Sequence, residues 1–416
     1  MLDETEVTRR AAASARGAVA TARRAADRAA AVLVCLDFGK EDDSAYEDGI
    51  AEIMRLAESA GSKRNTLVRG RRQRPDPKLY AGSGKVAEIG AAADALNAAT
   101  VIFNHTLSPG QQRNLEKELG RQVLDRTELI LHIFAQRAKT NEGKLQVELA
   151  QLEHLSTRLV RGWTHLERQR GGLGKTGGPG EKQIELDRRY IAARVRVLKD
   201  KLFELQKQRT VRRRARSRRD VFSVALVGYT NAGKSTLFNA LTQPAARGIA
   251  YVADQLFATL DATTRKVWVE GANPGGAGLR VVLADTVGFI RDLPHGLVAA
   301  FRATLEETVR ADLLLHVVDS ASPARAREAE DVNSVLAEIQ AGGIPQLAVW
   351  NKIDVAAGMQ ALAPAVERDE CGRISRVFVS ARTGAGLAGL RGAMAEAAQR
   401  RELAGQPRNP SPELSS

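Results

Sequence analysis

The first third of the chain alternates short apolar runs with amphipathic stretches of helical period. Strand-like apolar runs occupy residues 31–36, 66–69, 100–103 and 121–124. One helix is predicted over 47–60 and another over 108–119, where Ser108 is a favoured N-cap and Pro109 suits the first turn. The alternation predicts a small α/β domain over residues 31–125, preceded by a flexible tail over 1–30 that is rich in Ala and Arg.

Between residues 126 and 219 the pattern changes to two leucine-rich helical stripes. The first stripe comprises Leu145, Leu149, Leu152, Leu155 and Leu159. The second has a heptad-like period and comprises Ile191, Val195, Leu198, Leu202 and Leu205. Six of the ten residues over 171–180 are glycines, which excludes a stable helix there. The pattern predicts an antiparallel helical hairpin of two helices with a flexible glycine-rich tip.

From residue 220 onward the pattern becomes a repeated strand–loop–helix unit. Strands are predicted over 222–227, 266–269, 280–284, 313–318, 346–350 and 376–379. Helices are predicted over 234–241, 296–309, 324–341 and 386–400. The alternation is typical of a doubly wound, mostly parallel sheet over residues 220–402. A flexible tail is predicted over residues 403–416.

Charge is distributed unevenly over these segments. The chain of 416 residues has a formal net charge of +13, of which residues 1–219 account for +15 and the remainder for −2. Residues 155–219 alone contribute +14, so the hairpin is the source of the excess. A basic arm with a mobile tip suits insertion into a cavity lined by phosphates, although charge alone does not distinguish RNA from DNA. Two alternatives stay open: a solvated hairpin packed on a neighbouring domain, and a basic helix on a membrane surface.

Composition narrows the class of protein further. The apolar fraction of 44% and the charged fraction of 27% are near globular averages, which excludes a fully disordered chain. Cys35 and Cys371 lie far apart in the sequence and the six histidines show no ligand spacing, so no disulfide framework or zinc site is expected. The sequence starts without an apolar signal region, and it has no run of about 18 apolar residues. We therefore expect a cytoplasmic protein without a transmembrane segment.

A phosphate-binding motif follows the first strand of the back half. It fits G-x-x-x-x-G-K-S and comprises Gly228, Tyr229, Thr230, Asn231, Ala232, Gly233, Lys234 and Ser235. Its glycines let backbone N–H groups wrap a β-phosphate, and the helix that follows adds positive potential. Lys234 is expected to bridge the β- and γ-phosphates, and Ser235 to place its hydroxyl on Mg²⁺.

A second motif follows the strand predicted over 280–284. It comprises Asp285, Thr286, Val287 and Gly288. Asp285 is expected to reach Mg²⁺ through water, and the Gly288 amide to sense the γ-phosphate. A further hydroxyl ligand of Mg²⁺ is expected from Thr259, Thr263 or Thr264, between which spacing does not choose.

The residue that follows this motif, Phe289, affects the expected rate of hydrolysis. Phe289 stands where Ras-type sites have a Gln that orients the attacking water. A phenyl ring has no hydrogen-bonding group, so slow intrinsic hydrolysis is predicted, raised when a partner orders the site. A catalytic group from elsewhere in the chain is the alternative, and the catalytic residue is unknown.

Residues after the last two parallel strands indicate which base is bound. The first group comprises Asn351, Lys352, Ile353 and Asp354, and the second comprises Ser380, Ala381 and Arg382. The Asp354 carboxylate can accept hydrogen bonds from N1–H and the exocyclic amine of guanine, neither of which adenine offers. Asn351 can donate toward N7, the Lys352 stem can lie over the ring, and the Ala381 amide can reach O6. The ordered motifs predict a P-loop GTPase domain that binds GTP and GDP with Mg²⁺ as cofactor.

Beyond these generic motifs, the chain resembles the HflX family of ribosome-associated GTPases. The resemblance is carried by residues 80–85, 107–131, 135–152, 171–181, 227–241, 254–261 and 285–289. It implies GTP hydrolysis coupled to the large ribosomal subunit, and some members split stalled or idle 70S ribosomes under stress. By analogy, the tip of the hairpin approaches ribosomal RNA.

The resemblance also assigns residues of the switch loop. It implies that Thr259 is the Mg²⁺ ligand. It further implies nucleotide contact by Phe257, Ala258, Thr259, Leu260 and Asp261. Small departures from the family pattern occur in the hairpin, at His132 and Lys182.

Two questions stay open at this level. Some family members use ATP through the front domain, and the loop 82–85 is either a nucleotide contact or a tight turn that opens a helix. The chain could serve as a ribosome-splitting factor, as an assembly GTPase of the large subunit, or as an RNA-tethering protein with a barely active GTPase domain. A monomer is expected.

Overall fold

The computed structural model describes most of the chain. The described residues are 30–39, 42–161, 179–217, 221–242, 256–257, 259, 263–269, 278–291, 305–355 and 363–403. The glycine-rich tip up to residue 178 and nearly all of both predicted tails lie outside them, whereas Ala30 and Leu403 belong to a strand and a helix. The chain divides into two compact units, Met1–Glu204 and Leu205–Ser416.

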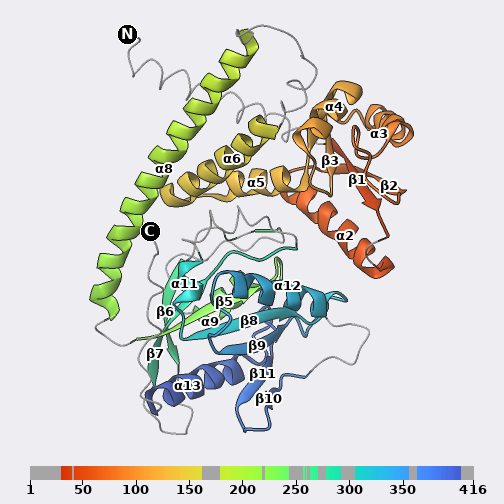
Figure 1. The fold of residues 1–416 in the computed structure, drawn as a ribbon. Helices are drawn as coiled ribbons and strands as arrows, with labels where there is room; N and C mark the ends of the chain where they lie inside the picture. Colours follow the sequence, from red (N-terminus) through yellow and green to blue (C-terminus); the bar gives the residue numbers. More distant parts are fainter. Residues whose placement is uncertain are drawn as a thin grey trace, which may run out of the picture. The chain divides into compact units, whose positions relative to one another are not determined.

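The first unit contains a four-stranded parallel sheet in the order β2-β1-β3-β4 (Figure 1). Its strands are β1 (Ala30–Asp37), β2 (Arg64–Arg71), β3 (Thr100–Phe103) and β4 (Gln122–Leu124). Its helices are α2 (Asp43–Ser59), α3 (Ser83–Leu96), α4 (Pro109–Leu119) and α5 (Arg126–Arg137). Because α3 and α4 pack on one face and α2 and α5 on the other, β1 is buried along nearly its whole length. The predicted α/β alternation is confirmed.

Local sequence sets where two of these helices begin. At α4, Ser108 and Gln111 form a capping box, with the Gln111 N–H donating to Ser108 Oγ at 3.3 Å. At α3, Gly82 has a φ of 80°, and a side chain there would clash with a neighbouring arginine. The loop 82–85 is thus a tight turn that opens a helix, and the Nζ of Lys85 donates to the carbonyl of Arg69 at 2.8 Å.

Two long helices follow the first sheet, α6 (Asn141–Arg161) and α8 (Pro179–Ser217). Their leucine-rich stripes meet in a cluster of Leu145, Leu149, Leu152, Ile191, Val195, Leu198 and Leu202. Two ion pairs accompany the cluster, Arg194–Glu148 at 2.6 Å and Lys199–Glu153 at 2.9 Å. The antiparallel direction of the helices and the flexible tip between them stay predictions.

The second unit contains a seven-stranded sheet in the order β10-β11-β9-β8-β5-β7-β6. Its strands are β5 (Phe222–Gly228), β6 (Thr263–Val269), β7 (Leu279–Asp285), β8 (Leu313–Asp319), β9 (Gln346–Asn351), β10 (Val366–Arg368) and β11 (Ile374–Phe378). The five central strands are parallel, and β6 and β10 at the edges are antiparallel to their neighbours. The predicted mostly parallel sheet is confirmed, although the sequence pattern does not predict the short edge strand β10.

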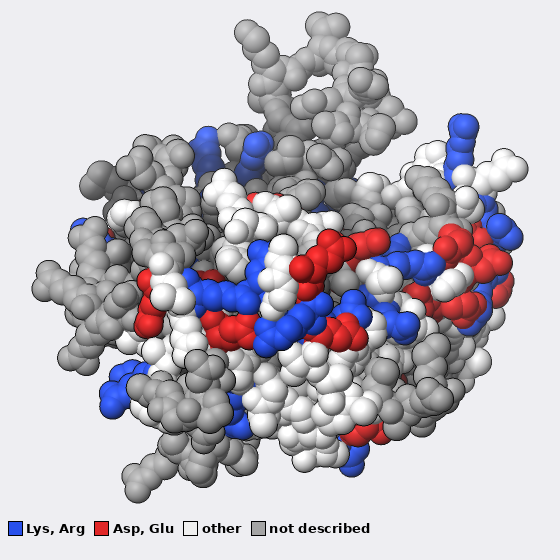
Figure 2. Space-filling view, turned by 90° about the horizontal axis from the view of Figure 1, so that it is seen from below, with Lys and Arg blue, Asp and Glu red and all other residues white. Residues whose placement is uncertain are grey.

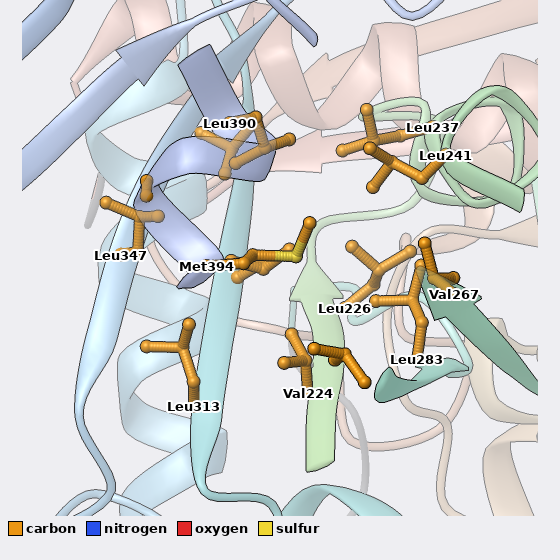
Figure 3. Packing of buried hydrophobic residues seen from close by; sticks show 14 of the residues in the cluster. Val224, Leu226, Leu237, Leu241, Val267, Leu283, Leu313, Leu347, Leu390 and Met394 are labelled. Atoms are coloured by element: carbon orange, nitrogen blue, oxygen red, sulfur yellow. The ribbon is translucent and has the colours of Figure 1, made fainter. Parts of the chain in front are cut away.

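The helices of this unit are α9 (Lys234–Thr242), α11 (Glu306–Val309), α12 (Arg325–Glu338) and α13 (Leu387–Leu403). Of the helix predicted over 296–309, residues up to 304 lie outside the described part, and the rest contains α11. Figure 3 shows apolar side chains of the sheet converging with those of α9 and α13. The labelled side chains are Val224, Leu226, Leu237, Leu241, Val267, Leu283, Leu313, Leu347, Leu390 and Met394. This core fixes the ends of the central strands, where the motifs lie.

The surface carries charges of both signs. On the face drawn in Figure 2, Lys and Arg side chains alternate with Asp and Glu among the described residues. Ion pairs in the second unit follow this pattern, for example Arg368–Glu396 at 3.0 Å and Arg373–Asp369 at 2.8 Å. In the described part of the chain, no helix is both long and apolar enough to span a membrane.

Candidate nucleotide-binding site

The phosphate-binding loop connects the end of β5 to the start of α9. Gly228 and Gly233 have φ values of 149° and 93°, which favour glycine. A side chain at Gly228 would clash with the carbonyl of Val317 in β8, and one at Gly233 with the amide of Asn351 in β9. The loop is therefore packed tightly against two neighbouring strand ends, and its glycines are required for that fit.

Lys234 lies inside this loop. Its Nζ donates to the carbonyl oxygens of Gly228 at 3.0 Å and Tyr229 at 2.7 Å. Burial lowers the pKa of Lys234 to about 8, although the nearby Asp285 carboxylate acts in the opposite direction. The loop carbonyls thus hold a buried cation at the place where the motif positions phosphate oxygens.

Three oxygen-bearing side chains meet beside the loop. The hydroxyl oxygens of Ser235 and Thr259 are 2.7 Å apart, and Thr259 donates to Asp285 Oδ2 at 2.8 Å. Asp285 is fully buried, and its Oδ1 has no hydrogen-bond partner. Burial raises the pKa of Asp285, and hydrogen bonds from Ser235 and Thr259 oppose that effect. Two hydroxyls and a carboxylate with an unpartnered oxygen fit Mg²⁺, which prefers oxygen ligands.

The structure distinguishes between the three threonines considered for this cluster. Thr259 is part of it, whereas Thr263 and Thr264 lie in β6, paired with Asp285 and Ala284 of β7. Of the other switch-loop positions, Phe257 is buried, and Ala258, Leu260 and Asp261 lie outside the described residues. Within the described residues, no group of three or more His, Cys, Asp or Glu side chains could hold a metal ion.

The second motif is tied to the phosphate-binding loop by its backbone. The Thr230 N–H donates to the carbonyl of Phe289 at 2.7 Å, and the Phe289 N–H donates to the carbonyl of Gly228 at 3.1 Å. A side-chain carbon added at Gly288 would lie 2.9 Å from Thr230 Cα and 3.0 Å from Lys234 Nζ, so this position requires glycine. The Phe289 side chain is only 1% exposed. It therefore lies in the core and presents no group that could orient water.

The other two residues of this motif, Thr286 and Val287, contact the protein core. Thr286 Oγ1 donates to the carbonyl of Leu226 in β5 at 2.6 Å. Val287 is buried. These contacts hold the segment after β7 against the central strand.

The residues predicted to read the base form one network at the ends of β9 and β11. Asn351 Nδ2 donates to the carbonyl of Ala232 at 2.9 Å, and the Ala381 N–H donates to Asn351 Oδ1 at 2.9 Å. Ser380 Oγ donates to Asp354 Oδ1 at 2.6 Å. The Asn351 amide has a second hydrogen for a ligand, but the single N–H of Ala381 is taken. Contact of Ala381 with guanine O6 therefore requires that this bond be exchanged.

Ile353 and Arg382 complete the predicted set. The Ile353 side chain is buried and its N–H bonds to the carbonyl of Val379 at 3.4 Å, whereas Arg382 is exposed. Sequence reasoning missed two residues: Asp319, which ends β8 and accepts a hydrogen bond from Lys352, and Ser320, which follows β8 and donates to the Asn351 carbonyl. The sequence feature that could have identified them is their position at the end of β8, the strand next to β9.

Three protein-family models match the chain. "GTP-binding GTPase N-terminal" matches residues 47–135, "GTP-binding GTPase Middle Region" matches 137–216, and "50S ribosome-binding GTPase" matches 223–352. The last match contains the phosphate-binding loop and ends at Lys352. The three segments follow one another along most of the chain.

Curated relatives match over most of the chain. A protein named GTPase HflX from Escherichia coli is 53% identical over 88% of this chain and 82% of its own length. A protein of the same name from Magnetococcus marinus is 49% identical over 85% of this chain and 79% of its own length. A solved structure of a GTP-binding protein from Sulfolobus solfataricus with GDP is 24% identical, with a TM-score of 0.45, over 89% of this chain and 99% of that chain.

Proposed function

Because the chain belongs to the HflX family of GTPases, we propose that it hydrolyses GTP while bound to the large ribosomal subunit. We further propose that it splits stalled or idle 70S ribosomes under stress. The observation that carries the GTPase part of the proposal is the convergence of three motifs at neighbouring strand ends. Ser235 lies beside Asp285, and Asn351 joins the phosphate-binding loop to the 380–382 loop. This arrangement suits a nucleoside triphosphate with guanine at one end and phosphates at the other.

The chain's own residues would divide the work of binding. Lys234 would exchange its two carbonyl partners for β- and γ-phosphate oxygens. Ser235 and Thr259 would hold Mg²⁺, with Asp285 acting behind them through water. When bound, Mg²⁺ neutralises charge that develops on the phosphate oxygens. Asp354 would accept hydrogen bonds from the guanine edge while keeping the Ser380 hydroxyl as its partner.

The hydrolytic step would depend on a partner. The ring of Phe289 is buried and its backbone is bonded to the phosphate-binding loop, so position 289 contributes no group to the attacking water. We propose that ribosome binding completes the catalytic site and so raises a low intrinsic rate. This dependence would couple hydrolysis to arrival at the ribosome.

The charge distribution supports ribosomal RNA as the surface that the chain meets. Residues 155–219 carry a net charge of +14, and much of this stretch belongs to α8. Such a charge favours a phosphate-rich partner. We propose that the protein is monomeric and cytoplasmic and has three functional parts. They are an α/β domain over 31–125, a basic arm over 126–219, whose first helix, α5, packs on the α/β domain, and a GTPase domain over 220–402.

We do not extend the proposal to ATP hydrolysis by the first unit. The loop 82–85 forms a helix-opening turn, and Lys85 is engaged by the carbonyl of Arg69 and by Glu88 at 2.7 Å. Unlike Lys234, which also has two partners, Lys85 is followed by Val86 and not by a Ser or Thr that could hold Mg²⁺.

Sucrose-gradient sedimentation of 70S ribosomes with the full chain tests the proposal. With a non-hydrolysable GTP analogue, we expect 70S particles to convert to subunits and the protein to sediment with the large subunit; with GDP, 70S particles should persist. Sedimentation with immature large-subunit precursors would instead favour an assembly GTPase. Association without splitting in either nucleotide state would favour an RNA tether.

A further inference from the structure

The ammonium group of Lys352 is fixed by an ion pair with Asp319. Lys352 follows β9 with a φ of 65°, in the left-handed region that side-chain-bearing residues adopt infrequently. Its Nζ donates to Asp319 Oδ2 at 2.7 Å. The Lys352 and Asp319 side chains are only 26% and 19% exposed. The pair is therefore more shielded than the exposed surface ion pairs that contribute little.

Asp319 is itself fixed by the turn after β8. Its Oδ1 accepts a hydrogen bond from the Ala321 N–H at 3.0 Å, which leaves Oδ2 for the lysine. Asp319 pairs in register with Asn351 of β9. Next to it, the Ser320 N–H and Oγ both donate to the Asn351 carbonyl, at 2.9 and 2.6 Å. The two strand ends are thus tied together beside the base-reading residues.

The stem of Lys352 runs beside the phosphate-binding loop. A side-chain carbon added at Gly233 would meet Lys352 Cε at 4.0 Å, which places the stem next to this loop. Its two ends are the left-handed backbone of Lys352 and the carboxylate of Asp319. Because a lysine stem is long and flexible, losing the carboxylate would release it into many rotamers.

We propose that Asp319 is a positioning residue for guanine-nucleotide binding, which holds the alkyl stem of Lys352 where the base read by Asn351 and Asp354 packs against it. The inference rests on the proposed function, since it takes the base to lie at this network. Asp319 touches no part of the nucleotide and acts only through Lys352. The effect should therefore appear in affinity, equally for GDP and GTP, and leave the hydrolytic step unchanged.

A double-mutant cycle in the full chain tests this role. Asp319→Asn keeps an acceptor for the Ala321 N–H but removes the charge that holds the lysine. We expect about tenfold weaker binding of both GDP and GTP, a matching rise in KM and an unchanged kcat. In a Lys352→Met background, which keeps an unbranched stem without the charge, Asp319→Asn should have no additional effect. Asp319→Glu should restore part of the affinity.

A control variant and three further outcomes separate the positioning role of Asp319 from a purely structural role and from failure of the proposed function. Glu396→Gln, which breaks surface ion pairs with Arg368 and Arg400 in the same unit, is the matched control and should leave affinity unchanged. Affinity lost equally with and without Lys352 would mean that Asp319 only stabilises the fold, and would overturn the inference. Unchanged affinity in Asp319→Asn would also overturn it. Failure of the unsubstituted chain to bind guanine nucleotides would instead reject the proposed function.

Discussion

The hydroxyl oxygens of Ser235 and Thr259 lie 2.7 Å apart, although 24 residues separate them in the sequence. Thr259 also donates to Asp285, which ends β7. The start of a helix, a switch-loop residue and a strand end thus bring three oxygen-bearing groups together. This relationship favours one threonine as the proposed Mg²⁺ ligand where spacing left three candidates.

Thr259→Ala should weaken GTP binding and hydrolysis by roughly tenfold to a hundredfold, because it removes one oxygen from the proposed Mg²⁺ site. GDP binding should change much less, because the Thr259 hydroxyl is expected to bind Mg²⁺ only when the triphosphate is bound. Fluorescent-nucleotide titrations over a range of Mg²⁺ concentrations measure both effects. The matched control is Thr264→Ala at an exposed position of β6, which should behave like the unsubstituted chain. Equal losses in the two variants would reject the assignment.

Asp354→Asn should shift base preference from guanine to xanthine. The amide can donate to the carbonyl that replaces the exocyclic amine of guanine, whereas it no longer accepts two hydrogen bonds from guanine. We expect GTP affinity to fall by about a hundredfold or more and XTP affinity to rise. Competition between GTP and XTP measures the change, with the exposed Glu370→Gln as control. Unchanged GTP preference would contradict the base-reading role of Asp354.

Glu128 should make the stability of the first unit depend on pH. Burial raises its pKa to about 7, as does the nearby Asp125, whereas Arg158, 3.4 Å away, acts in the opposite direction. Between about pH 4.5 and 7 the folded state then binds more protons than the unfolded state, so the free energy of unfolding falls as pH rises. Gln112 and His154 also face this carboxyl group.

Glu128→Gln should remove this part of the pH dependence. Because the Glu128 side chain is about one fifth exposed, we expect a contribution of about 1–2 kcal/mol between pH 5 and 8 rather than the full value implied by the pKa. Urea titrations followed by circular dichroism at both pH values measure it. Glu118→Gln, at an exposed position of α4, is the control. A variant that loses as much stability as the unsubstituted chain between these pH values would contradict the prediction.

Phe289→Gln should not produce a Ras-like catalytic site. Backbone bonds to Thr230 and Gly228 hold this position, and the side chain is directed into the core. The buried amide should lower stability by about 1–3 kcal/mol and leave the basal rate of GTP hydrolysis within about twofold. Single-turnover hydrolysis measures the rate, with Phe289→Leu as the apolar control. A tenfold faster rate in a folded Gln variant would contradict the account.

Strong local signals in the sequence predict most of the fold. Apolar runs at strands β1 and β5 are long, and the Ser108 capping box marks the start of α4 to the residue. β10 escapes prediction because its three residues, Val366 to Arg368, are all exposed and have no apolar periodicity. The sequence does not decide the role of the residues where α3 begins, because Gly82 and Gly84 suit a phosphate loop as well as a turn.

The sequence predicts only those residues of the candidate site that belong to short contiguous motifs. Lys234 and Asp354 belong to short patterns whose chemistry is explicit. By contrast, the Asp319–Lys352 pair forms because β8 and β9 are neighbours in the sheet. No local sequence pattern predicts which parallel strands are neighbours. The Ala381 bond to Asn351 has the same cause, since it joins the ends of β9 and β11 across 30 residues.

The rate of GTP hydrolysis by the full chain, measured with and without purified 50S subunits, tests the central claim most directly. We expect a low rate for the protein alone and stimulation of at least about tenfold by 50S subunits, since a partner must supply what Phe289 lacks. The stimulation should weaken as salt is raised, because the proposed contact of the basic arm with RNA is electrostatic. Equal rates with and without 50S subunits, at a protein concentration where binding is complete, would contradict a ribosome-dependent GTPase.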